Sequence, residues 1–191
     1  MTEEKVFDQR PLWVFGYASL LWNPGFEIVE QKLAVLSGYH RSFCMSSIHH
    51  RGTVDKPGLV LALDAMEGAV CHGLALRVPD DRIDPTVAYL RERELISSAY
   101  VEKLLPLEFE DGGQATALAY VIDPGHQQYV AGMSLEKQAQ IIATAIGGRG
   151  PNTEYLWNTA DHLREMGVED ADLEWLSARV RELVSAKGST A

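Results

Sequence analysis

A glutamate on the apolar stripe of a predicted helix is the residue best suited to chemistry. The spacing of apolar residues predicts a helix from Pro85 to about Ile96. Val87 and Leu90 are expected to face the core, and Glu94 follows them by seven and four residues, on the same face. Burial and the nearby helix C-terminus both disfavour a negative charge, so we expect a raised pKa for this carboxyl group. Such a group can act as a general acid or base near neutral pH.

The other charges around Glu94 are expected to behave differently. Arg91, Glu92 and Arg93 lie off the apolar line and are expected to reach water. A second interpretation of Glu94 itself is a frayed last turn, which would let its side chain swing into solvent.

A polar loop, residues 46–52, offers groups for binding. Arg51 can hold a carboxylate as a clamp, although an arginine in a loop can equally be solvated. The adjacent His49 and His50 lack the i,i+4 spacing of a helical metal pair, and neither His-Glu-x-x-His nor Cys-x-x-Cys occurs. We therefore expect no metal site here.

Two further polar features have weaker functional interpretations. The glycine-rich run 147–152 lacks the Gly-Lys-Ser/Thr ending of a phosphate loop and is expected to connect two helices. Tyr155 follows it in the first turn of a helix, where its hydroxyl can reach a ligand or its ring can simply pack on the core.

The stretch Trp13–Trp22 is expected to position these groups. It begins as an apolar strand, breaks at Gly16 and continues with small residues and a second apolar run. A strand that ends at small residues presents backbone N–H groups, which can hold a carboxylate or a carbonyl oxygen. A strand of this length can also be core only.

The remaining elements predict an α+β fold. Alternating or apolar segments predict strands in the first two thirds of the chain, at residues 12–17, 28–36, 39–46, 59–63, 70–78, 100–109 and 115–122. Helical spacing dominates the last third, with Ser134, Asn152 and Asp170 as expected N-caps. Pro106 should keep its segment from being a regular central strand. This separation favours a curved, mostly antiparallel or mixed sheet with helices beside it.

Size and charge limit the possible partners. The 191 residues suit a single domain, with residues 1–10 and 187–191 expected to be flexible. A net charge of −10 argues against nucleic acid and anionic membranes as partners. The sequence shows neither a signal peptide nor a long apolar span, and Cys44 and Cys71 are expected to be buried, reduced thiols. These features favour a cytoplasmic protein.

Several separated motifs resemble the ChaC-like family of gamma-glutamylcyclotransferases over about residues 12–183. The matching segments occur in the family's order: Trp13-Val-Phe-Gly-Tyr-Ala-Ser-Leu-Leu-Trp22, Arg41-Ser-Phe43, His50-Arg51-Gly52, Lys56-Pro-Gly58, Gly73-Leu-Ala-Leu-Arg77, Tyr89-Leu-Arg-Glu-Arg-Glu94 and Gly150-Pro-Asn-Thr-Glu-Tyr-Leu156. The specificity of the resemblance rests on their order and spacing together.

The resemblance implies a fold, a reaction and a site. The fold is a small mixed β-barrel surrounded by helices, and the reaction releases 5-oxoproline from a gamma-glutamyl compound. For ChaC-like members that compound is glutathione, and cysteinylglycine is the other product. The family's gamma-glutamyl-binding motif falls on Tyr17, Ala18, Ser19 and Leu20, and its catalytic glutamate falls on Glu94.

The chain departs from the family pattern at two places. Ala18 replaces the usual glycine of the binding motif, and Ser97-Ser-Ala99 replaces the small glycine-containing segment that often follows the glutamate. If the first position requires a positive φ or close approach of the ligand, alanine would weaken binding.

The expected enzyme is a glutathione-specific cyclotransferase that uses no metal, no cofactor and no covalent intermediate. Two alternatives remain open. One is a cyclotransferase for other gamma-glutamyl amines or peptides, and the other is a non-catalytic regulatory protein that binds small ligands on the same fold.

Overall fold

The computed structural model describes residues 8–188, so most of the termini predicted to be flexible lies outside the described residues. Within them, Arg10 donates a hydrogen bond to the Asp80 carbonyl, and the last helix continues to Gly188. Contacts divide the described residues into two compact units, one of residues 8–40 and 65–123 and one of residues 41–64 and 124–188. The prediction of a single domain stays a prediction.

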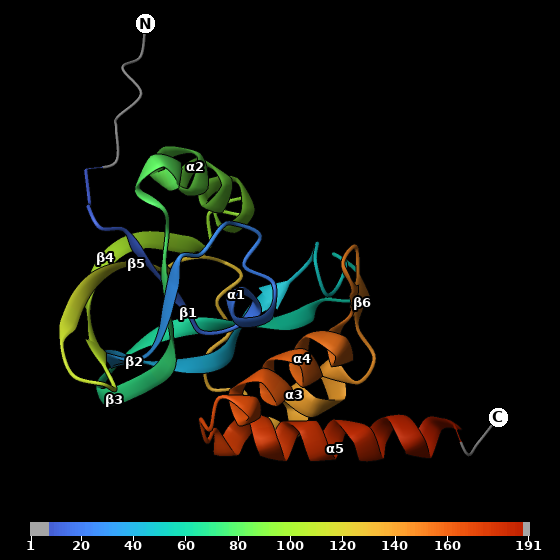
Figure 1. Ribbon diagram of the computed structural model, residues 1–191. Helices are drawn as coiled ribbons and strands as arrows, with labels where there is room; N and C mark the ends of the chain where they lie inside the picture. The colour runs from blue at the N-terminus through green and yellow to red at the C-terminus, as the bar shows by residue number, and fades with distance from the viewer. Residues whose placement is uncertain (1–7, 189–191) are drawn as a thin grey trace, which may run out of the picture. The chain divides into compact units, whose positions relative to one another are not determined.

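The first unit is built on a closed, mixed β-barrel (Figure 1). Its strand order is β1 (Trp13–Gly16), β3 (Gly58–Arg77), β2 (Glu30–Ser47), β4 (Tyr100–Phe109) and β5 (Gln114–Ile122). Strand β1 runs parallel to β5 and antiparallel to β3. The inward side chains form an apolar core, which includes Phe15, Leu76, Leu107 and Leu118. The predicted α+β class and barrel are confirmed.

Strands β2 and β3 correct the predicted strand boundaries. The sequence predicts a break at Ser37-Gly38 and another at residues 66–68, which would divide each segment into two strands. Instead, β2 runs through 18 residues and β3 through 20. Gly38 and Gly68 adopt positive φ angles of 83° and 78° inside these strands. A glycine can therefore change the local direction of a strand without ending it.

The hairpin of β4 and β5 tolerates a proline. The two strands pair from Tyr100↔Ile122 to Glu108↔Gln114, and Pro106 lies opposite Thr116. On its other side β4 pairs with β2 at Ala34↔Phe109 and Val35↔Glu108, and Pro106 lies outside these two pairs. The missing N–H of proline therefore interrupts none of the pairs with β2.

Two helices belong to the first unit. Helix α1 (Ser19–Trp22), which is not predicted from the sequence, follows β1 after two residues. Helix α2 (Ile83–Glu94) follows a short 3₁₀ turn, η1 (Asp80–Arg82). It starts two residues before the predicted Pro85 and ends two residues before the predicted Ile96.

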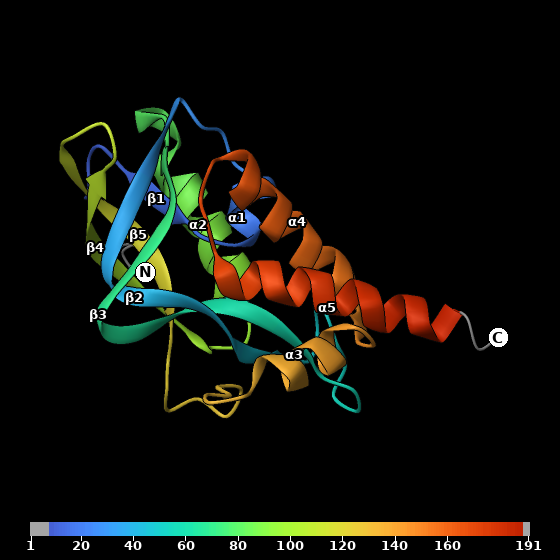
Figure 2. The same ribbon diagram turned by 90° about the horizontal axis from the view of Figure 1, so that it is seen from below.

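The second unit contains the ends of β2 and β3, three helices and a short two-stranded sheet. The helices are α3 (Leu135–Ile142), α4 (Asn152–Glu165) and α5 (Ala171–Gly188), and Figure 2 shows them side by side. The sheet consists of β6 (Ile146–Gly147) and β7 (Gly150–Pro151), within the segment predicted to be a plain helix connection.

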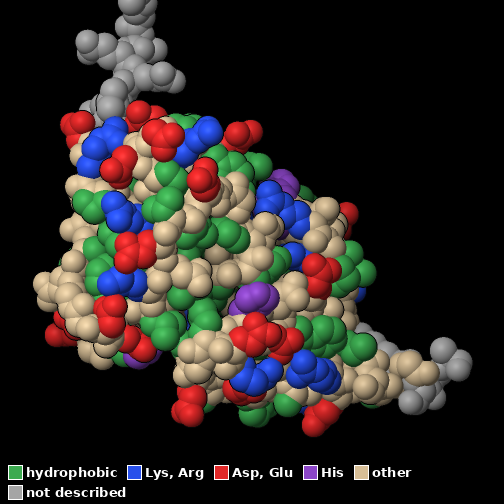
Figure 3. Space-filling view, in the orientation of Figure 1, with side chains coloured by type: hydrophobic (Ala, Val, Ile, Leu, Met, Phe, Trp, Pro, Cys, Tyr) green, Lys and Arg blue, Asp and Glu red, His purple; other side chains and the backbone are tan. Residues whose placement is uncertain are grey.

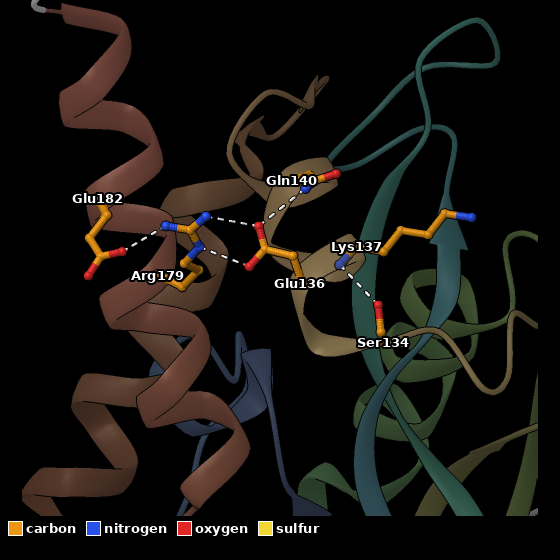
Figure 4. A network of polar contacts seen from close by, with 6 residues as sticks. All are labelled: Ser134, Glu136, Lys137, Gln140, Arg179 and Glu182. Carbon is orange, nitrogen blue, oxygen red and sulfur yellow. Dashed lines mark hydrogen bonds and ion pairs between the residues drawn. The ribbon is translucent and has the colours of Figure 1, made fainter.

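Polar side chains fix the helices of this unit at their ends and sides. The predicted caps Ser134 and Asp170 accept hydrogen bonds from the backbone N–H groups of Lys137 and Leu173. Arg179 of α5 binds Glu136 of α3 through two nitrogens, at 2.9 and 3.0 Å (Figure 4). This pair connects α3 to α5 on the surface.

Asn152 is not the helix cap that the sequence predicts. It is the first residue of α4 and is fully buried. Its side-chain amide donates to the carbonyl of Leu59 at 2.8 Å and accepts from the N–H of the same residue at 2.7 Å. The side chain therefore ties the start of α4 to the start of β3, and the first-turn N–H groups are not its partners.

Candidate active site

The predicted binding segment Tyr17–Leu20 forms the turn between β1 and α1. Strand β1 ends at Gly16, where the neighbouring strand comes close because Gly73 has no side chain: a Cβ there would overlap the Gly16 carbonyl. Ala18 precedes the helix, and Ser19 and Leu20 form its first turn. The Leu21 N–H donates to the Ala18 carbonyl inside this turn, and binding of a ligand by the N–H groups of Tyr17–Leu20 stays a prediction.

Tyr17 is held inside the first unit by its ring and its hydroxyl. It is buried, and its hydroxyl donates a hydrogen bond to the Tyr120 carbonyl at 3.1 Å. The Tyr120 hydroxyl donates in turn to Glu102, which Arg91 binds through two nitrogens. Burial raises the pKa of Tyr120, and the carboxylates of Glu102 and Glu94 raise it further. The Tyr120 side chain therefore stays a neutral donor to Glu102, while its backbone carbonyl holds the Tyr17 hydroxyl.

The φ angle of Ala18 is not in the positive range that favours glycine. Its φ is −143°, and its side chain is buried. One of the two reasons for a glycine at this position, a left-handed φ, therefore does not apply in this chain. The other reason, close approach of a ligand to Cα, remains.

Glu94 is the last residue of α2, and its side chain is only 16% exposed. The prediction that the helix turns this carboxylate away from water is therefore consistent with the structure. One carboxylate oxygen lies 3.1 Å from Nε of Arg93. Burial disfavours the charged form of this carboxyl group, whereas the adjacent guanidinium favours it, and the expected raised pKa stays a prediction.

Arg93 is the main correction in this region. The sequence predicts that it reaches water, but its side chain is only 5% exposed. Its guanidinium contacts Ser19 of the binding turn and Glu94, so the structure brings these two predicted site residues to one group. The signal was present: Arg93 lies three residues after Leu90 and seven after Thr86, both buried. The buried face of α2 is therefore wide enough to include Arg93.

The segment after Glu94 contains a strained residue. Ser98 has a φ of 57°, which makes it the single non-glycine residue with a positive φ among residues 8–188. This is the second place where the sequence departs from a glycine-containing pattern. A serine in this conformation lacks the freedom that glycine would have there.

Arg51 and Tyr155 lie in the second unit and contact each other. The Arg51 guanidinium lies over the Tyr155 ring, donates to the Pro151 carbonyl at 3.1 Å and approaches Glu154 at 3.8 Å. The side chain is 7% exposed, so the interpretation of a solvated loop arginine is wrong. Burial lowers the pKa of Arg51, and Glu154 opposes this effect. The group remains cationic, since arginine titrates far above neutral pH.

Tyr155 makes contacts with its hydroxyl and with its ring. Its hydroxyl accepts a hydrogen bond from the Leu61 N–H at 3.1 Å, and its ring packs edge-on against Phe43. The prediction that the Tyr155 ring packs on the core is therefore confirmed, while a contact between its hydroxyl and a ligand stays a prediction. The loop around Arg51 is fixed by the glycine-rich run, because Gly148 and Arg149 donate to the carbonyls of His49 and His50.

Comparisons with known proteins identify the family. The family model of the ChaC-like proteins matches residues 12–183. The chain belongs to the ChaC-like family. A glutathione-specific gamma-glutamylcyclotransferase of Escherichia coli K12 is 35% identical over 93% of this chain and 76% of the relative. A human protein named glutathione-specific gamma-glutamylcyclotransferase 1 is 32% identical over 91% of this chain and 78% of its own length.

A solved structure supports the fold of this ChaC-like chain. A yeast gamma-glutamylcyclotransferase specific to glutathione superposes with a TM-score of 0.82 and covers 90% of this chain and 96% of that one. Its sequence identity is 21%, so this likeness speaks for the fold alone. The predicted barrel with surrounding helices is confirmed by this comparison and by the strand order.

The chemistry open to this ChaC-like chain follows from the groups in its first unit. A largely buried carboxylate, Glu94, can take and return a proton, and the turn Tyr17–Leu20 can hold an anionic oxygen by its N–H groups. Among residues 8–188, His, Cys, Asp and Glu side chains form no group of three that could hold a metal ion. Over the same range, none of the helices is long and apolar enough to cross a membrane.

Proposed function

We propose that this chain is a gamma-glutamylcyclotransferase that converts glutathione into 5-oxoproline and cysteinylglycine. The observation that carries the proposal is the position of Glu94: a mostly buried carboxylate whose guanidinium partner also binds Ser19 of the turn Tyr17–Leu20. The relatives named above as acting on glutathione support the choice of substrate.

The reaction requires little beyond positioning and one proton carrier. The substrate's α-amine attacks its own γ-carbonyl carbon, which forms a new C–N bond and closes a five-membered ring. The bond from the γ-carbon to the cysteinyl nitrogen then breaks. Because both reacting groups belong to one molecule, holding the gamma-glutamyl part in a folded conformation accounts for much of the rate.

Glu94 is proposed to move the proton. The α-amine is largely protonated at neutral pH, so a base must accept a proton before or during attack. The leaving nitrogen must then receive one, and a single carboxyl group between the two nitrogens can do both. The N–H groups of Tyr17, Ala18, Ser19 and Leu20 are proposed to hold the α-carboxylate or the developing oxyanion. The bonds formed and broken and the protons moved balance without water, a metal or a cofactor.

Arg51 and Tyr155 remain proposed substrate-binding residues. Arg51 is a buried cation, and glutathione carries two carboxylates that such a group can bind. Its contacts with Pro151 and Tyr155 fix the guanidinium plane in advance. Tyr155 would then act through its ring or its hydroxyl.

A cytoplasmic location is also part of the proposal. Cys44 and Cys71 are both buried thiols, which agrees with a reducing compartment. Burial raises the pKa of the Cys44 thiol to about 12, so this cysteine is not a reactive nucleophile. The proposed partner is a small molecule, and the expected absence of nucleic acid and membrane partners stays a prediction.

A second substrate class is favoured by one observation, the alanine at position 18 in place of the family's usual glycine. A methyl group inside the binding turn can change which gamma-glutamyl compound fits best. The alternative is therefore a cyclotransferase for other gamma-glutamyl amines or peptides.

The test compares two substrates with the purified full-length chain. Glutathione and gamma-glutamyl-alanine are supplied separately, and 5-oxoproline is measured over time. We expect release from glutathione with the higher kcat/KM. Faster release from gamma-glutamyl-alanine would favour the alternative, and no release from either would support a non-catalytic binding protein.

A further inference from the structure

The buried guanidinium of Arg93 joins the binding turn to the carboxylate proposed to do the chemistry. We propose that Arg93 is a positioning residue, which holds the Glu94 carboxylate and the segment Ser19–Pro24 in the geometry that cyclisation requires. This inference rests on the proposed function. It assigns a role to a side chain that neither binds substrate nor moves a proton.

One nitrogen of Arg93 fixes the backbone that follows α1. Nη1 donates to the carbonyl of Asn23 at 2.7 Å and to that of Pro24 at 3.1 Å. These two carbonyls lie just beyond the end of α1, and the guanidinium supplies each of them with a donor. The turn that begins at Tyr17 is thereby held at its far end.

The other two nitrogens reach the site itself. Nη2 donates to the Ser19 hydroxyl at 3.0 Å, and Nε lies 3.1 Å from a carboxylate oxygen of Glu94. Because the guanidinium is planar and rigid, these contacts fix the direction of the carboxylate relative to the turn. A lysine has a single nitrogen at the end of a flexible chain and cannot make all of these contacts together.

The surroundings of Arg93 contain a further group that orients it. The hydroxyl of Tyr89, one turn earlier on α2, accepts from Nη1 at 3.1 Å. The ring reaches this place because Gly25 leaves room: a Cβ at Gly25 would overlap the Tyr89 hydroxyl, and its φ of 75° also favours glycine. Tyr89 and Gly25 therefore both contribute to the placement of the Arg93 guanidinium.

A purely packing role explains these contacts poorly. Taking an arginine out of water is costly, and an apolar side chain of similar size would fill a buried position at lower cost. The cation also acts on Glu94, which lies at the negative end of α2 and close to Tyr120 of β5. Tyr120 is neutral and binds Glu102 of β4, while Arg93 contacts the Glu94 carboxylate directly.

The experiment separates charge from geometry with two variants. Arg93→Met removes both, while Arg93→Lys keeps the charge. For each variant, kcat, KM and the pH dependence of kcat/KM are measured with glutathione. Arg164→Met is the control, because it removes the same charge from an exposed arginine that binds Asp161 and Glu174 on the second unit.

We expect kcat to fall about 10²-fold in both Arg93 variants, with a much smaller change in KM, because a carboxylate displaced by about 1 Å can lose that much rate. In Arg93→Met the acid limb of the pH profile moves to higher pH, because a carboxylate without its cation takes up a proton more readily. In Arg93→Lys the limb stays near that of the unaltered chain. Arg164→Met should match the unaltered chain.

Two results would overturn the inference. One is a folded Arg93→Lys variant with the kcat of the unaltered chain, and the other is an unshifted acid limb in Arg93→Met. If both variants fail to fold, Tyr89→Phe decides: it removes one acceptor of Arg93 and should lower kcat several-fold, and an unchanged kcat would contradict the role. An unaltered chain that releases no 5-oxoproline would instead refute the proposed function, and this inference with it.

Discussion

Ala18 places a methyl group in the turn proposed to hold the gamma-glutamyl part, where ChaC-like proteins usually have glycine. Its φ of −143° lies outside the positive range that favours glycine. The remaining effect of the methyl group is on the space available to a ligand. We therefore expect the departure from the family pattern to affect substrate affinity.

Replacing this methyl group gives a first prediction. Ala18→Gly should leave kcat/KM for glutathione equal or higher, because space is added beside the ligand. Its stability should change by less than about 1 kcal/mol, because the greater freedom of glycine in the unfolded chain is opposed by its preference over alanine at a helix N-cap. Steady-state kinetics and thermal unfolding measure the two effects. Loss of activity in a folded variant would show that the methyl group itself is needed.

Ser98 gives a second prediction, one of stability. A φ of 57° is unfavourable for a side chain with a Cβ, so Ser98→Gly should stabilise the chain by up to about 1 kcal/mol. Ser97→Gly is the matched control, because among residues 8–188 the positive φ of a non-glycine residue occurs at Ser98 alone. Chemical denaturation should show the control to be less stable than the parent. A destabilised Ser98→Gly variant would contradict the argument.

The sequence could predict some roles at the residue scale and not others. Glu94 was found because its spacing from Val87 and Leu90 fits the apolar face of one helix. Arg93 lies on the edge of the same face and was assigned to solvent by its charge. Its burial depends on backbone carbonyls at Asn23 and Pro24, which are distant in the sequence and carry no side-chain signal.

At the scale of elements, Asn152 connects α4 to β3 by two hydrogen bonds to the backbone of Leu59. Asn152→Ala should destabilise the chain by about 2–4 kcal/mol, because it leaves a buried N–H and a buried carbonyl without this partner. Asn158→Ala, on the same helix and only partly buried, should change stability by less than about 0.5 kcal/mol. Equal stability of the two variants would show that water replaces the lost bonds.

The network that joins α3 to α5 predicts a dependence of stability on pH (Figure 4). Hydrogen bonding to Arg179, and then to Gln140, lowers the pKa of Glu136 below its ordinary value of 4.5. A lowered carboxyl pKa stabilises the fold above the unfolded-state value, and this contribution disappears as the pH falls through the folded-state value. Glu136→Gln should therefore show a smaller fall in Tm on acidification than the parent.

The control for this prediction is Glu165→Gln, an exposed change on α4 outside the network. It should leave the pH dependence of Tm close to that of the parent. Because both partners of the Glu136–Arg179 pair are partly exposed, the effect should be small and should weaken as salt is added. A parent and a Glu136→Gln variant with parallel Tm curves would contradict the role of this pair.

The boundaries of elements were harder to predict than their types. Gly38 and Gly68 were interpreted as breaks, although each lies inside a continuous strand with a positive φ. Helix α1 was missed, because four residues are too few to show a helical period. In both cases the ends of the element depend on how the strands of the barrel pair. A local pattern of residues does not predict this pairing.

At the scale of the whole molecule, the distribution of charge and the family both fit a small-molecule ligand. The net charge of −10 is spread over many side chains. On the face shown in Figure 3, Lys and Arg side chains lie among Asp and Glu side chains and do not form a separate basic patch. A small anion would therefore be bound by individual buried cations such as Arg51.

The fold class was predictable from the sequence because strands and helices are separated along the chain. The barrel and the family followed from seven ordered motifs and not from composition or period, and the strand order and the comparisons confirm both. The roles of the site residues remain proposals, since spacing places a carboxylate on a helix face but does not show that it moves a proton.

The most direct test of the account is the rate of 5-oxoproline release from glutathione by Glu94→Gln, measured beside the unaltered chain. Glutamine keeps the size of the side chain and a polar contact with Arg93 but cannot accept a proton. We predict that the variant folds with a similar Tm and loses about 10²–10⁴-fold or more in kcat/KM. A folded Glu94→Gln chain that releases 5-oxoproline at nearly the unaltered rate would contradict the assignment of Glu94 as the acid and base.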